Sequence, residues 1–432
     1  MTDHTDIYIG ARVVYHTLGC KLNFAETATL RDRLIGYGAV DAAEDGDADL
    51  CIINTCSVTG ESDQKCRQAI RRLHRRHPEA VIGVMGCYAQ LQGEAISRIE
   101  GVSLVVGMEH RGRMAELLIP HLEAKRRATL CTAPETEIQT TSTRDIHTFV
   151  PSCSRGNRTR YFLKVQDGCS YYCTYCTIPI ARGRSRNGSI ASLVAQAEAV
   201  AEAGGKEIVI TGVNIGDFGR STGEDFLALV KALDGVRGIE RFRISSLEPD
   251  LLTHDIIDAC AASRAFMPHF HIPLQSGSDA VLRLMHRHYD AALFADRVHY
   301  LLRAMPDAFI GVDVIVGTRG ETADYFAQSE AFIREMPIAQ LHVFPYSERP
   351  GTKALAIAHT VSPEEKRERS KRLLTLSEEK HRTFYDRYVG TARPVLWEHG
   401  EGWTDNYIRV RGEGTPNTIT SVMLTPEVLI KT

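Results

Sequence analysis

Residues 161–176 read YFLKVQDGCSYYCTYC, a strand-like run followed at once by three cysteines. The aromatic and alternating residues at 161–166 predict a β-strand. Cys169, Cys173 and Cys176 then form a CxxxCxxC pattern. Three thiolates can hold three irons of a [4Fe–4S] cluster and leave the fourth iron open to a small molecule. An incomplete zinc site, which would need a fourth ligand, and a chance group of buried thiols are weaker alternatives.

Five more strand-like runs follow this segment, and each leads into helix-compatible sequence. They are EIVITGV (207–213), RFRISSL (241–247), FHIPLQ (270–275), IGVDVIVG (310–317) and QLHVFPY (340–346). Six such βα units predict a partial or complete parallel α/β barrel over residues 156–360. The chemistry of such barrels lies at the C-terminal ends of the strands, which is where the three cysteines stand.

The N-terminal part also alternates strand and helix. Its apolar runs are RVVYHTL (12–18), LCIINT (50–55), VIGVMG (81–86) and SLVVG (103–107). Separated by amphipathic stretches, they predict an open parallel α/β sheet in a domain spanning residues 1–127.

Three cysteines follow the ends of these N-terminal runs, in TLGCKLN, NTCSVT and MGCYAQ. The separations of Cys20, Cys56 and Cys87 are 36 residues (56 − 20) and 31 residues (87 − 56). One βαβ unit has ~30 residues, so successive parallel strands would deliver the three thiols to one edge of the sheet. Three unrelated buried cysteines are the alternative.

The other cysteines are expected to be structural, because they lie in apolar patterns or lack a partner at ligand spacing. They are Cys51, Cys66, Cys131, Cys153 and Cys260. Residues 128–155, rich in Thr and Ser, are predicted to be a linker. Residues 361–389 are predicted to be a helical connector, and residues 390–432 a small β domain of short alternating runs.

Composition limits the partners. The chain has 432 residues, with 51 Lys and Arg against 54 Asp and Glu, for a net charge of −3. No overall positive field attracts nucleic acid, so DNA is not an expected partner and RNA would have to meet local patches. The chain shows no secretion signal and no membrane-spanning run, and its eleven cysteines favour reduced thiols. A soluble, cytoplasmic protein is therefore expected.

Two local clusters of basic residues could contact RNA phosphates. Arg67, Arg71 and Arg75 recur every four residues after Cys56, with Lys65, Arg72 and Arg76 beside them. The ARGRSR segment adds Arg182, Arg184 and Arg186. A solvated charged face is an equally good interpretation of each cluster alone, and it is the better one for EKRERSKR, where glutamates are interleaved.

The CxxxCxxC segment at the end of the first barrel strand resembles the radical S-adenosylmethionine (SAM) enzymes. The resemblance implies that SAM binds the open iron and that one electron cleaves it to a carbon radical. It also implies cofactor contacts at the strand ends, with the TGV segment (211–213) near the methionyl group and the end of FHIPLQ near the ribose. These expected cofactor contacts are Tyr175, Gly212, Ser246, Gln275, Gly317 and Phe344.

Two three-cysteine sites followed by a small β domain are similar to the methylthiotransferases of this group. Within it the chain most resembles the threonylcarbamoyladenosine tRNA branch, through TLGCKLNFAE, NTCSVT, VQDGC, ARGRSR, HIPLQSGSD and HVFPYSERPGT. The resemblance implies addition of a methylthio group to C2 of the modified adenosine beside the anticodon, with two SAM molecules and two [4Fe–4S] clusters. The implied cluster ligands are Cys20, Cys56 and Cys87, and Cys169, Cys173 and Cys176.

The same resemblance implies further partners and leaves rivals open. The tail is similar to the OB-like TRAM domain that binds tRNA, and a flavodoxin or ferredoxin would supply electrons. No catalytic residue beyond the cluster ligands is assigned. The rivals are the same chemistry on an isopentenylated tRNA adenosine or a ribosomal-protein aspartate, and a non-catalytic iron–sulfur protein that binds RNA or acts as a sensor. The chain has Gly317-Thr318-Arg319-Gly320 where Gly-Phe-Pro-Gly is usual, so an altered turn is expected there.

Overall fold

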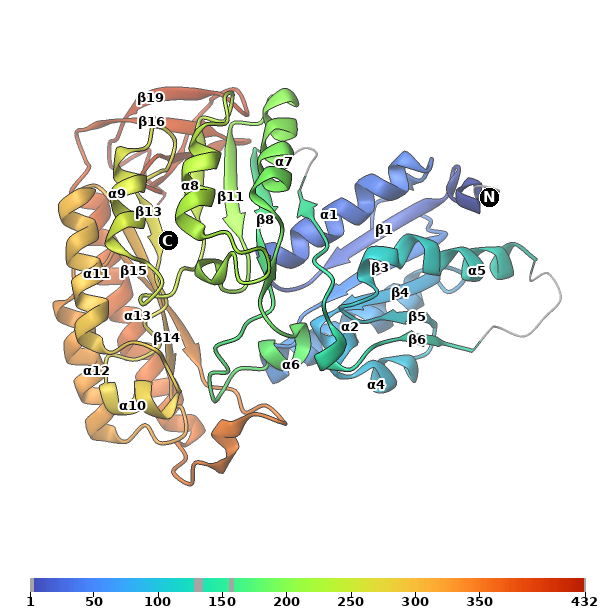
Figure 1. Ribbon diagram of the computed structural model, residues 1–432, viewed down its shortest axis with the longest axis horizontal. Coiled ribbons are helices and arrows are strands. Elements are labelled where there is room, and N and C mark those ends of the chain that lie inside the picture. Colours follow the sequence, from blue (N-terminus) through green and yellow to red (C-terminus); the bar gives the residue numbers. More distant parts are fainter. Residues whose placement is uncertain (1–3, 128–134, 155–158, 431–432) are drawn as a thin grey trace. The chain divides into compact units, whose positions relative to one another are not determined.

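The computed structural model describes residues 4–127, 135–154 and 159–430 (Figure 1). By their contacts, these residues form two compact units. Unit 1 comprises Met1–Gly156, Asp167–Ser170 and Cys176–Arg186. Unit 2 comprises Asn157–Gln166, Tyr171–Tyr175 and Asn187–Thr432. Within the predicted linker, residues 128–134 and 155, Cys131 among them, lie outside the described residues.

Unit 1 is built on a parallel six-stranded sheet in the order β2-β1-β3-β4-β5-β6. Every residue of the central strands β3 and β4 is buried, as expected where helices cover both faces of a parallel sheet. The strands are β1 (Arg12–Thr17), β2 (Val40–Asp41), β3 (Leu50–Thr55), β4 (Val81–Gly86), β5 (Val102–Val106) and β6 (Glu137–Gln139). Strand β6 lies inside the segment predicted to be a linker.

Two apolar cores lie on the two faces of this sheet, one centred on Leu34, Leu50 and Leu118, the other on Ile53, Ile70 and Val84. The helices that supply them are α1 (Lys21–Gly36), α2 (Gly60–Arg76), α3 (Cys87–Leu91), α4 (Gly93–Ser97) and α5 (Met114–Arg127). Unit 1 also contains β7 (Ser152–Cys153), α6 (Ile178–Arg182) and the 3-10 turns η1 (His4–Tyr8), η2 (Arg111–Arg113) and η3 (Thr143–Asp145).

Unit 2 contains the predicted partial barrel. Three strands pair in parallel as β8-β11-β12 and three as β13-β14-β15. Parallel bridges from Phe242 to Phe266 and from Ser246 to His271 join β12 to the second set. The strands are β8 (Arg160–Lys164), β11 (Glu207–Thr211), β12 (Arg241–Ile244), β13 (His269–His271), β14 (Phe309–Val316) and β15 (Gln340–Pro345).

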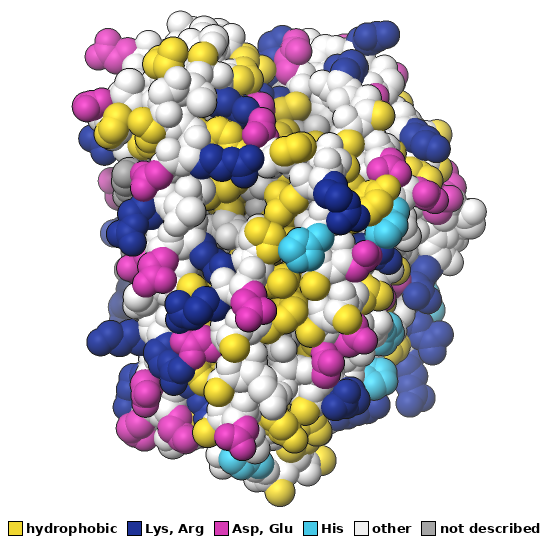
Figure 2. Space-filling view, turned by 90° about the vertical axis from the view of Figure 1, so that its left-hand side faces the viewer, with side chains coloured by type: hydrophobic (Ala, Val, Ile, Leu, Met, Phe, Trp, Pro, Cys, Tyr) yellow, Lys and Arg dark blue, Asp and Glu magenta, His cyan; other side chains and the backbone are white. Residues whose placement is uncertain are grey.

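Helices follow the barrel strands, as in a βα repeat (Figure 1). They are α7 (Ile190–Glu202), α8 (Phe226–Asp234), α9 (His254–Ala262), α10 (Asp279–Leu284), α11 (Ala291–Ala304), α12 (Ala323–Glu335) and α13 (Pro363–Asp386). Short elements are β9 (Gln166–Asp167), β10 (Arg186–Asn187), η4 (Ile215–Asp217) and η5 (Lys353–Ala356). On the face seen in Figure 2, basic and acidic side chains are interspersed.

The tail forms a small antiparallel sheet in the order β18-β17-β16-β19. Its strands are β16 (Ala392–Trp397), β17 (Glu401–Thr404), β18 (Arg409–Arg411) and β19 (Ile419–Met423). The three-part fold class expected from the sequence is thereby confirmed: an open parallel sheet, a partial barrel and a small β domain. None of the described helices is long and apolar enough to cross a membrane.

The tail sits at the N-terminal ends of the barrel strands (Figure 1). Two buried arginines at the start of β12 donate hydrogen bonds to the backbone of the tail. Arg241 donates to the carbonyl oxygens of Trp403 at 2.9 Å and Pro394 at 2.8 Å, and Arg243 donates to those of Asp405 and Thr404 at 2.8 and 2.7 Å. The tail therefore occupies the end of the barrel opposite to the predicted chemistry.

Candidate active site

The structure brings Cys20, Cys56 and Cys87 to one edge of the unit 1 sheet. Cys56 directly follows β3, Cys87 begins α3 straight after β4, and Cys20 caps α1 beyond the end of β1. These three strands are neighbours, and the strand order reverses between β1 and β3. Open α/β sheets bind ligands in the crevice at such a reversal.

Two glycines let the cysteine loops approach each other. A Cβ atom on Gly19 would lie 2.9 Å from the Cβ of Cys56. Gly86 has a φ of +107°, and a Cβ atom there would lie 2.4 Å from the carbonyl oxygen of Thr55. Both residues directly precede a cysteine, so no larger residue could keep the thiols as close as they are.

Asn23, buried on the first turns of α1, connects two of the cysteine loops. Its amide nitrogen donates to the carbonyl oxygens of Leu18 at 2.8 Å and Thr55 at 3.1 Å. Its Oδ1 lies 3.8 Å from the Cys20 thiol. Asn23 thereby fixes the backbone just before Cys20 and just before Cys56.

The thiols of this group fit a cluster that brings its own positive charge. Burial raises the pKa of Cys56, and it raises the pKa of Cys87 to about 12. The charge of Arg182 lowers both pKa values, whereas the charges of neighbouring thiols raise them further. A metal centre would have to displace these protons to bind.

Among the residues that the structure describes, no group of three or more His, Cys, Asp or Glu side chains is arranged to hold a metal ion. A cluster binds each thiolate at a separate iron, so its ligands are spaced more widely than those of one ion. The arrangement required for a single metal ion is therefore not the one that a cluster requires.

The second cysteine group lies in the loop after β8. Cys173 is buried, and Cys169 and Cys176 are partly exposed. Tyr172 has a φ of +53°, an uncommon value for a residue other than glycine, and it bends the loop between the first two cysteines. Thr174 anchors the loop within unit 2, since its backbone nitrogen donates to the Met285 carbonyl at 3.0 Å and its hydroxyl to that of Leu284 at 2.8 Å.

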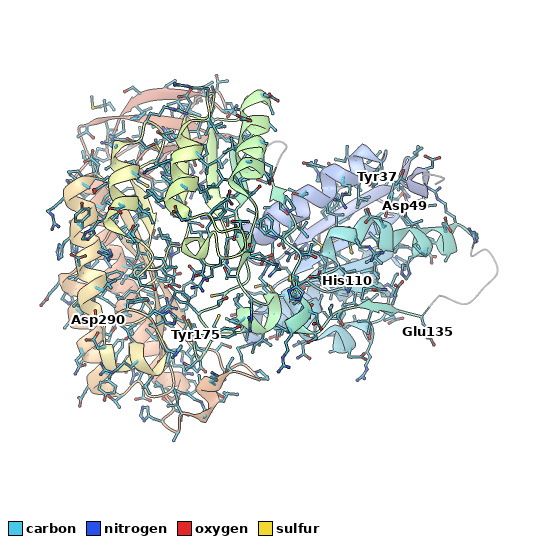
Figure 3. The ribbon with its side chains drawn as sticks, in the orientation of Figure 1. Tyr37, Asp49, His110, Glu135, Tyr175 and Asp290 are labelled. Carbon is cyan, nitrogen blue, oxygen red and sulfur yellow. The ribbon has the colours of Figure 1, made fainter. Side chains whose placement is uncertain are left out.

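A buried ion pair supports this loop. Arg287, whose side chain is 3% exposed, pairs with Glu248 and donates to the Cys173 thiol at 3.1 Å. Arg287 also donates to the hydroxyl of Tyr175, labelled in Figure 3, at 3.4 Å. Burial raises the pKa of Glu248 to about 7, although the charge of Arg287 opposes this shift. Tyr175 is among the contacts expected from the sequence, whereas Arg287 and Glu248 were not expected, because no local spacing connects them.

Gly212 ends β11 in a tight turn held by Gln166. The Gln166 Oε1 accepts hydrogen bonds from the backbone nitrogens of Val213 and Asn214, each at 2.9 Å. A Cβ atom on Gly212 would lie 3.0 Å from that same Oε1. Asn214 is buried, and neither of its side-chain polar atoms has a partner among the described residues. The turn thus presents unsatisfied polar groups that a polar ligand could satisfy.

Ser246, just beyond the end of β12, begins a chain of hydrogen bonds that crosses the end of β13 and reaches Asp313 within β14. Its hydroxyl lies 3.4 Å from Nδ1 of His271, and Nε2 of His271 lies 2.7 Å from Oδ1 of Asp313. His271 and Asp313 are partly exposed, with 21% and 20% of their side chains accessible. Asp313 was not expected from the sequence to take part in such a contact, because it looks like an interruption of the apolar run of β14.

Gln275, Gly317 and Phe344 lie on neighbouring strand ends. Gln275 has a φ of +64°, and its buried Oε1 has no partner among the described residues. Phe344 pairs with Ile315 across β14 and β15 and is 48% exposed. Gly317 has a φ of +74° and donates its backbone N–H to Glu321 at 2.6 Å. An orphaned amide oxygen and an exposed ring at the strand ends fit a ligand with polar and planar parts, as SAM has.

In the unusual Gly317–Gly320 turn, the side chain of Arg319 pairs with Glu348 at 2.7 Å and donates to the carbonyl oxygens of Leu355 and Ile357, each at 3.0 Å. The charge gained at this position therefore has a local role inside unit 2.

The structure separates the predicted basic clusters into buried and exposed arginines. Arg182 and Arg186 are buried, so the expectation that they contact RNA phosphates is wrong, and only Arg184 of that segment is exposed. On α2, Arg67 donates to the Tyr88 hydroxyl at 2.8 Å, whereas Arg71 and Arg75 are exposed.

Comparison with known proteins gives two family matches and a similar solved fold. The description "Uncharacterized protein family UPF0004" matches residues 12–107, and the Radical SAM superfamily matches residues 163–333. Among solved structures, the radical SAM methyltransferase TsrM from Kitasatospora setae is similar, with a TM-score of 0.57 at 13% identity over 80% of this chain and 77% of that one. Fold and family match together define a radical SAM enzyme, with SAM and [4Fe–4S] as its cofactors.

Curated relatives make the assignment more specific. The chain is 36% identical to "Threonylcarbamoyladenosine tRNA methylthiotransferase MtaB" of Bacillus subtilis, over 96% of this chain and 93% of that protein. It is 33% identical to the Aquifex aeolicus protein of the same name, over 93% and 97% of the two chains. It is 32% identical to "tRNA-2-methylthio-N(6)-dimethylallyladenosine synthase" of Thermobifida fusca, over 93% and 81%. The chain belongs to the radical SAM tRNA methylthiotransferase family.

Proposed function

We propose that this enzyme adds a methylthio group to C2 of N6-threonylcarbamoyladenosine beside the anticodon of tRNA. The observation that carries the proposal is the convergence of Cys20, Cys56 and Cys87 at the crevice of the unit 1 sheet. The group of Cys169, Cys173 and Cys176 alone would suffice for radical chemistry. The additional group in unit 1, with each cysteine at a strand end, supports a separate site for the sulfur-containing group.

The segment that begins at Cys176 contacts the first cysteine group within unit 1. Thr177, the residue after Cys176, donates its hydroxyl to the carbonyl oxygen of Ser57, the residue after Cys56, at 3.3 Å. Helix α6 then packs on α3, which begins at Cys87. These contacts place the end of the second cysteine loop beside the first cysteine group within unit 1.

The proposed roles follow from position. Cys20, Cys56 and Cys87 hold one [4Fe–4S] cluster, and Cys169, Cys173 and Cys176 hold the other. Tyr175, Gly212, Ser246, Gln275, Gly317 and Phe344 line the SAM site at the strand ends. The bound cofactors supply hydrogen-atom abstraction from an unactivated C–H bond, which acid–base groups could not achieve. Gln275 and the Gly212 turn orient the ligand, and Arg287 holds the Cys173 loop.

We further propose that the enzyme works in the cytoplasm and receives electrons from a flavodoxin or ferredoxin. The exposed arginines on α2 would bind tRNA phosphates, and the unstacked bases of an anticodon loop allow the target adenosine to leave its stack at low cost. An isopentenylated adenosine is the second candidate substrate, favoured by the 32% identity to the Thermobifida fusca synthase.

Nucleoside analysis by mass spectrometry of tRNA from cells with and without the gene tests the proposal. We expect the methylthio form of threonylcarbamoyladenosine to disappear, its precursor to accumulate, and the native chain to restore the product. A Cys173→Ala chain should not restore it. Loss of a methylthio isopentenyladenosine instead would assign the second substrate, and unchanged tRNA would overturn the proposal.

A further inference from the structure

The buried core of unit 1 contains an unusual group of charges beside Cys87. Arg111, Arg182 and Arg186 have side chains only 3%, 1% and 6% exposed. The carboxylates that face them, Glu26 and Asp167, are 3% and 0% exposed. Burying charge is costly unless it is compensated, so this group requires a physical reason.

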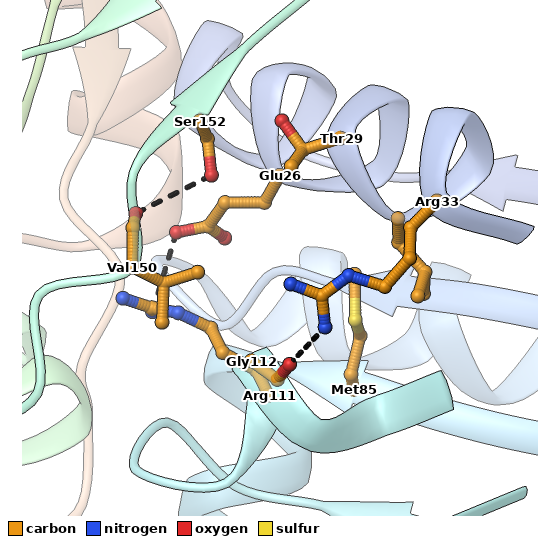
Figure 4. Close-up of a pocket in the computed structure, with 9 residues that line it drawn as sticks. Glu26, Thr29, Arg33, Met85, Arg111, Gly112, Val150 and Ser152 are labelled. Carbon is orange, nitrogen blue, oxygen red and sulfur yellow. Dashed lines mark hydrogen bonds and ion pairs between the residues drawn. The ribbon is translucent and has the colours of Figure 1, made fainter. Parts of the chain in front are cut away.

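The ion pairs connect every member of the group. Arg182 lies 3.1 Å from Glu26 and 2.9 Å from Asp167. Arg111 lies 3.2 Å from Glu26 and also pairs with Asp167. Arg186 lies 3.3 Å from Asp167. Figure 4 shows Glu26 and Arg111 together at the wall of a small pocket.

Within this set the positive charge is in excess, because three guanidinium groups face two carboxylates. The contacts of Arg182 indicate what balances the excess positive charge. Arg182 donates from Nε to the Cys87 thiol at 3.2 Å and from a terminal nitrogen to Oδ1 of Asn23 at 2.7 Å. Asn23 in turn lies beside Cys20. The excess charge therefore faces two of the three proposed cluster ligands.

We propose that Arg182 is a positioning residue for the N-terminal cluster. Its guanidinium holds Cys87 in the ligand position and makes the site cationic, so that the site favours an iron–sulfur centre with net negative charge. The inference rests on the proposed function for the presence of a cluster at Cys20, Cys56 and Cys87. Hydrogen bonds to ligand sulfur and nearby charge are established controls of cluster potential.

The location of Arg182 gives this role a further consequence. It ends α6, six residues after Cys176, yet it contacts the N-terminal cysteine group rather than the exposed surface. Ala181 beside it packs with Cys87, Met108 and Ile146 in one apolar cluster. The segment that follows the second cysteine group thus completes the surroundings of the first.

The test uses the full chain, reconstituted without oxygen, and reads bound iron and the cluster potentials by EPR-monitored titration. A variant with Cys169, Cys173 and Cys176 all changed to Ala identifies which signal belongs to the N-terminal cluster. Arg182→Gln should lower the occupancy of that cluster and move its potential to a more negative value, because a positive charge next to it is removed. Arg182→Lys should restore the potential. Arg184→Gln, an exposed control two residues away, should change neither quantity.

If Arg182→Gln does not fold, the doubly substituted Arg182→Gln/Glu26→Gln chain takes its place. Its potential should shift in the same direction but less, because the lost negative charge of Glu26 partly offsets the lost positive charge that lies next to Cys87. A folded Arg182→Gln chain with native iron content and potential would overturn the inference. So would equal potentials in the Gln and Lys variants with only a loss of stability, since that is a purely structural role. A native chain that binds iron at only one cysteine group would instead contradict the proposed function, before any arginine is changed.

Discussion

At the scale of single residues, the chemistry depends on which thiols can reach a common centre. Cys66 is a useful contrast to Cys56: it is buried, and its thiol donates to the carbonyl oxygen of Cys56 at 3.3 Å. Proximity alone therefore does not make a ligand. What distinguishes Cys56 is its position at the end of a strand, facing the crevice.

Replacing Cys56 by serine should remove one cluster, so that iron falls from about eight to about four atoms per chain. Cys66→Ser should retain all the iron, because serine can donate the same hydrogen bond. Iron determination on both anaerobically reconstituted variants checks this. Equal iron loss in the two would contradict the assigned ligand set.

The Arg287–Glu248 pair makes a second residue-scale prediction. Arg287→Met leaves a nearly buried carboxylate without its partner and should reduce the free energy of unfolding by about 3–5 kcal/mol. The double variant Arg287→Met/Glu248→Leu should recover most of that loss, because no lone charge is left behind. Urea unfolding of the native chain, the single variant and the double variant, all free of iron, measures these free energies. A double variant less stable than the single one would refute the explanation.

At the scale of elements, the junction of β4 and α3 is the tightest part of the site. Gly86→Ala should reduce the free energy of unfolding by about 3 kcal/mol or more, since the backbone there is one that only glycine adopts easily and a Cβ would overlap the strand beside it. Gly204→Ala is the matched control. Gly204 also has a positive φ, of +82°, but nothing lies within 4 Å of the added Cβ. The Gly204→Ala variant should therefore lose only about 1 kcal/mol of its free energy of unfolding. Urea unfolding of both variants measures the difference.

The strand pattern and the cysteine spacing were enough to predict these elements, because buried parallel strands give continuous apolar runs such as LCIINT. They could not predict the strand order or the burial of Arg182 and Arg186. Arginine is usually exposed, and the partner Glu26 is 156 residues away from Arg182 along the chain. Long-range ion pairs leave no periodic signal, so Arg287 and Glu248 were missed for the same reason.

Helix α2 provides the element-scale test of tRNA binding. The double variant Arg71→Gln/Arg75→Gln should weaken tRNA binding about threefold or more. The slope of the logarithm of the binding constant against the logarithm of the salt concentration should become shallower by about one unit for each phosphate that is no longer neutralised. Arg367→Gln on α13 is the control, because that exposed side chain is already paired with Glu364 at 2.8 Å. Fluorescence anisotropy at several salt concentrations measures both. Equal weakening in the control would argue against a specific role of α2 in binding.

At the scale of the whole molecule, the attachment of the tail should depend on pH. Burial raises the pKa of Asp307, but hydrogen bonds from Arg393 and Tyr388 outweigh it and leave the pKa below its usual value. The stability from this group is therefore present above the usual carboxyl pKa of ~3.9 and lost as the pH falls through the lower, folded value. Asp307→Asn should flatten the acid side of the stability profile, whereas Asp255→Asn, an exposed residue of α9, should not. Urea unfolding between pH 3 and 7 tests this.

The two units are interlaced along the chain: residues 167–170 and 176–186 belong by contact to unit 1, although unit 2 residues precede and follow them. During translation, Glu26 and Arg111 are synthesised before Asp167 and Arg182, which lie further along the chain. Until the chain through residue 186 has emerged, Glu26 and Arg111 have only each other as partners in this group, and the pairs with Asp167 and Arg182 are missing. A gene fragment ending at the apparent domain boundary would encode a protein missing part of its own interior.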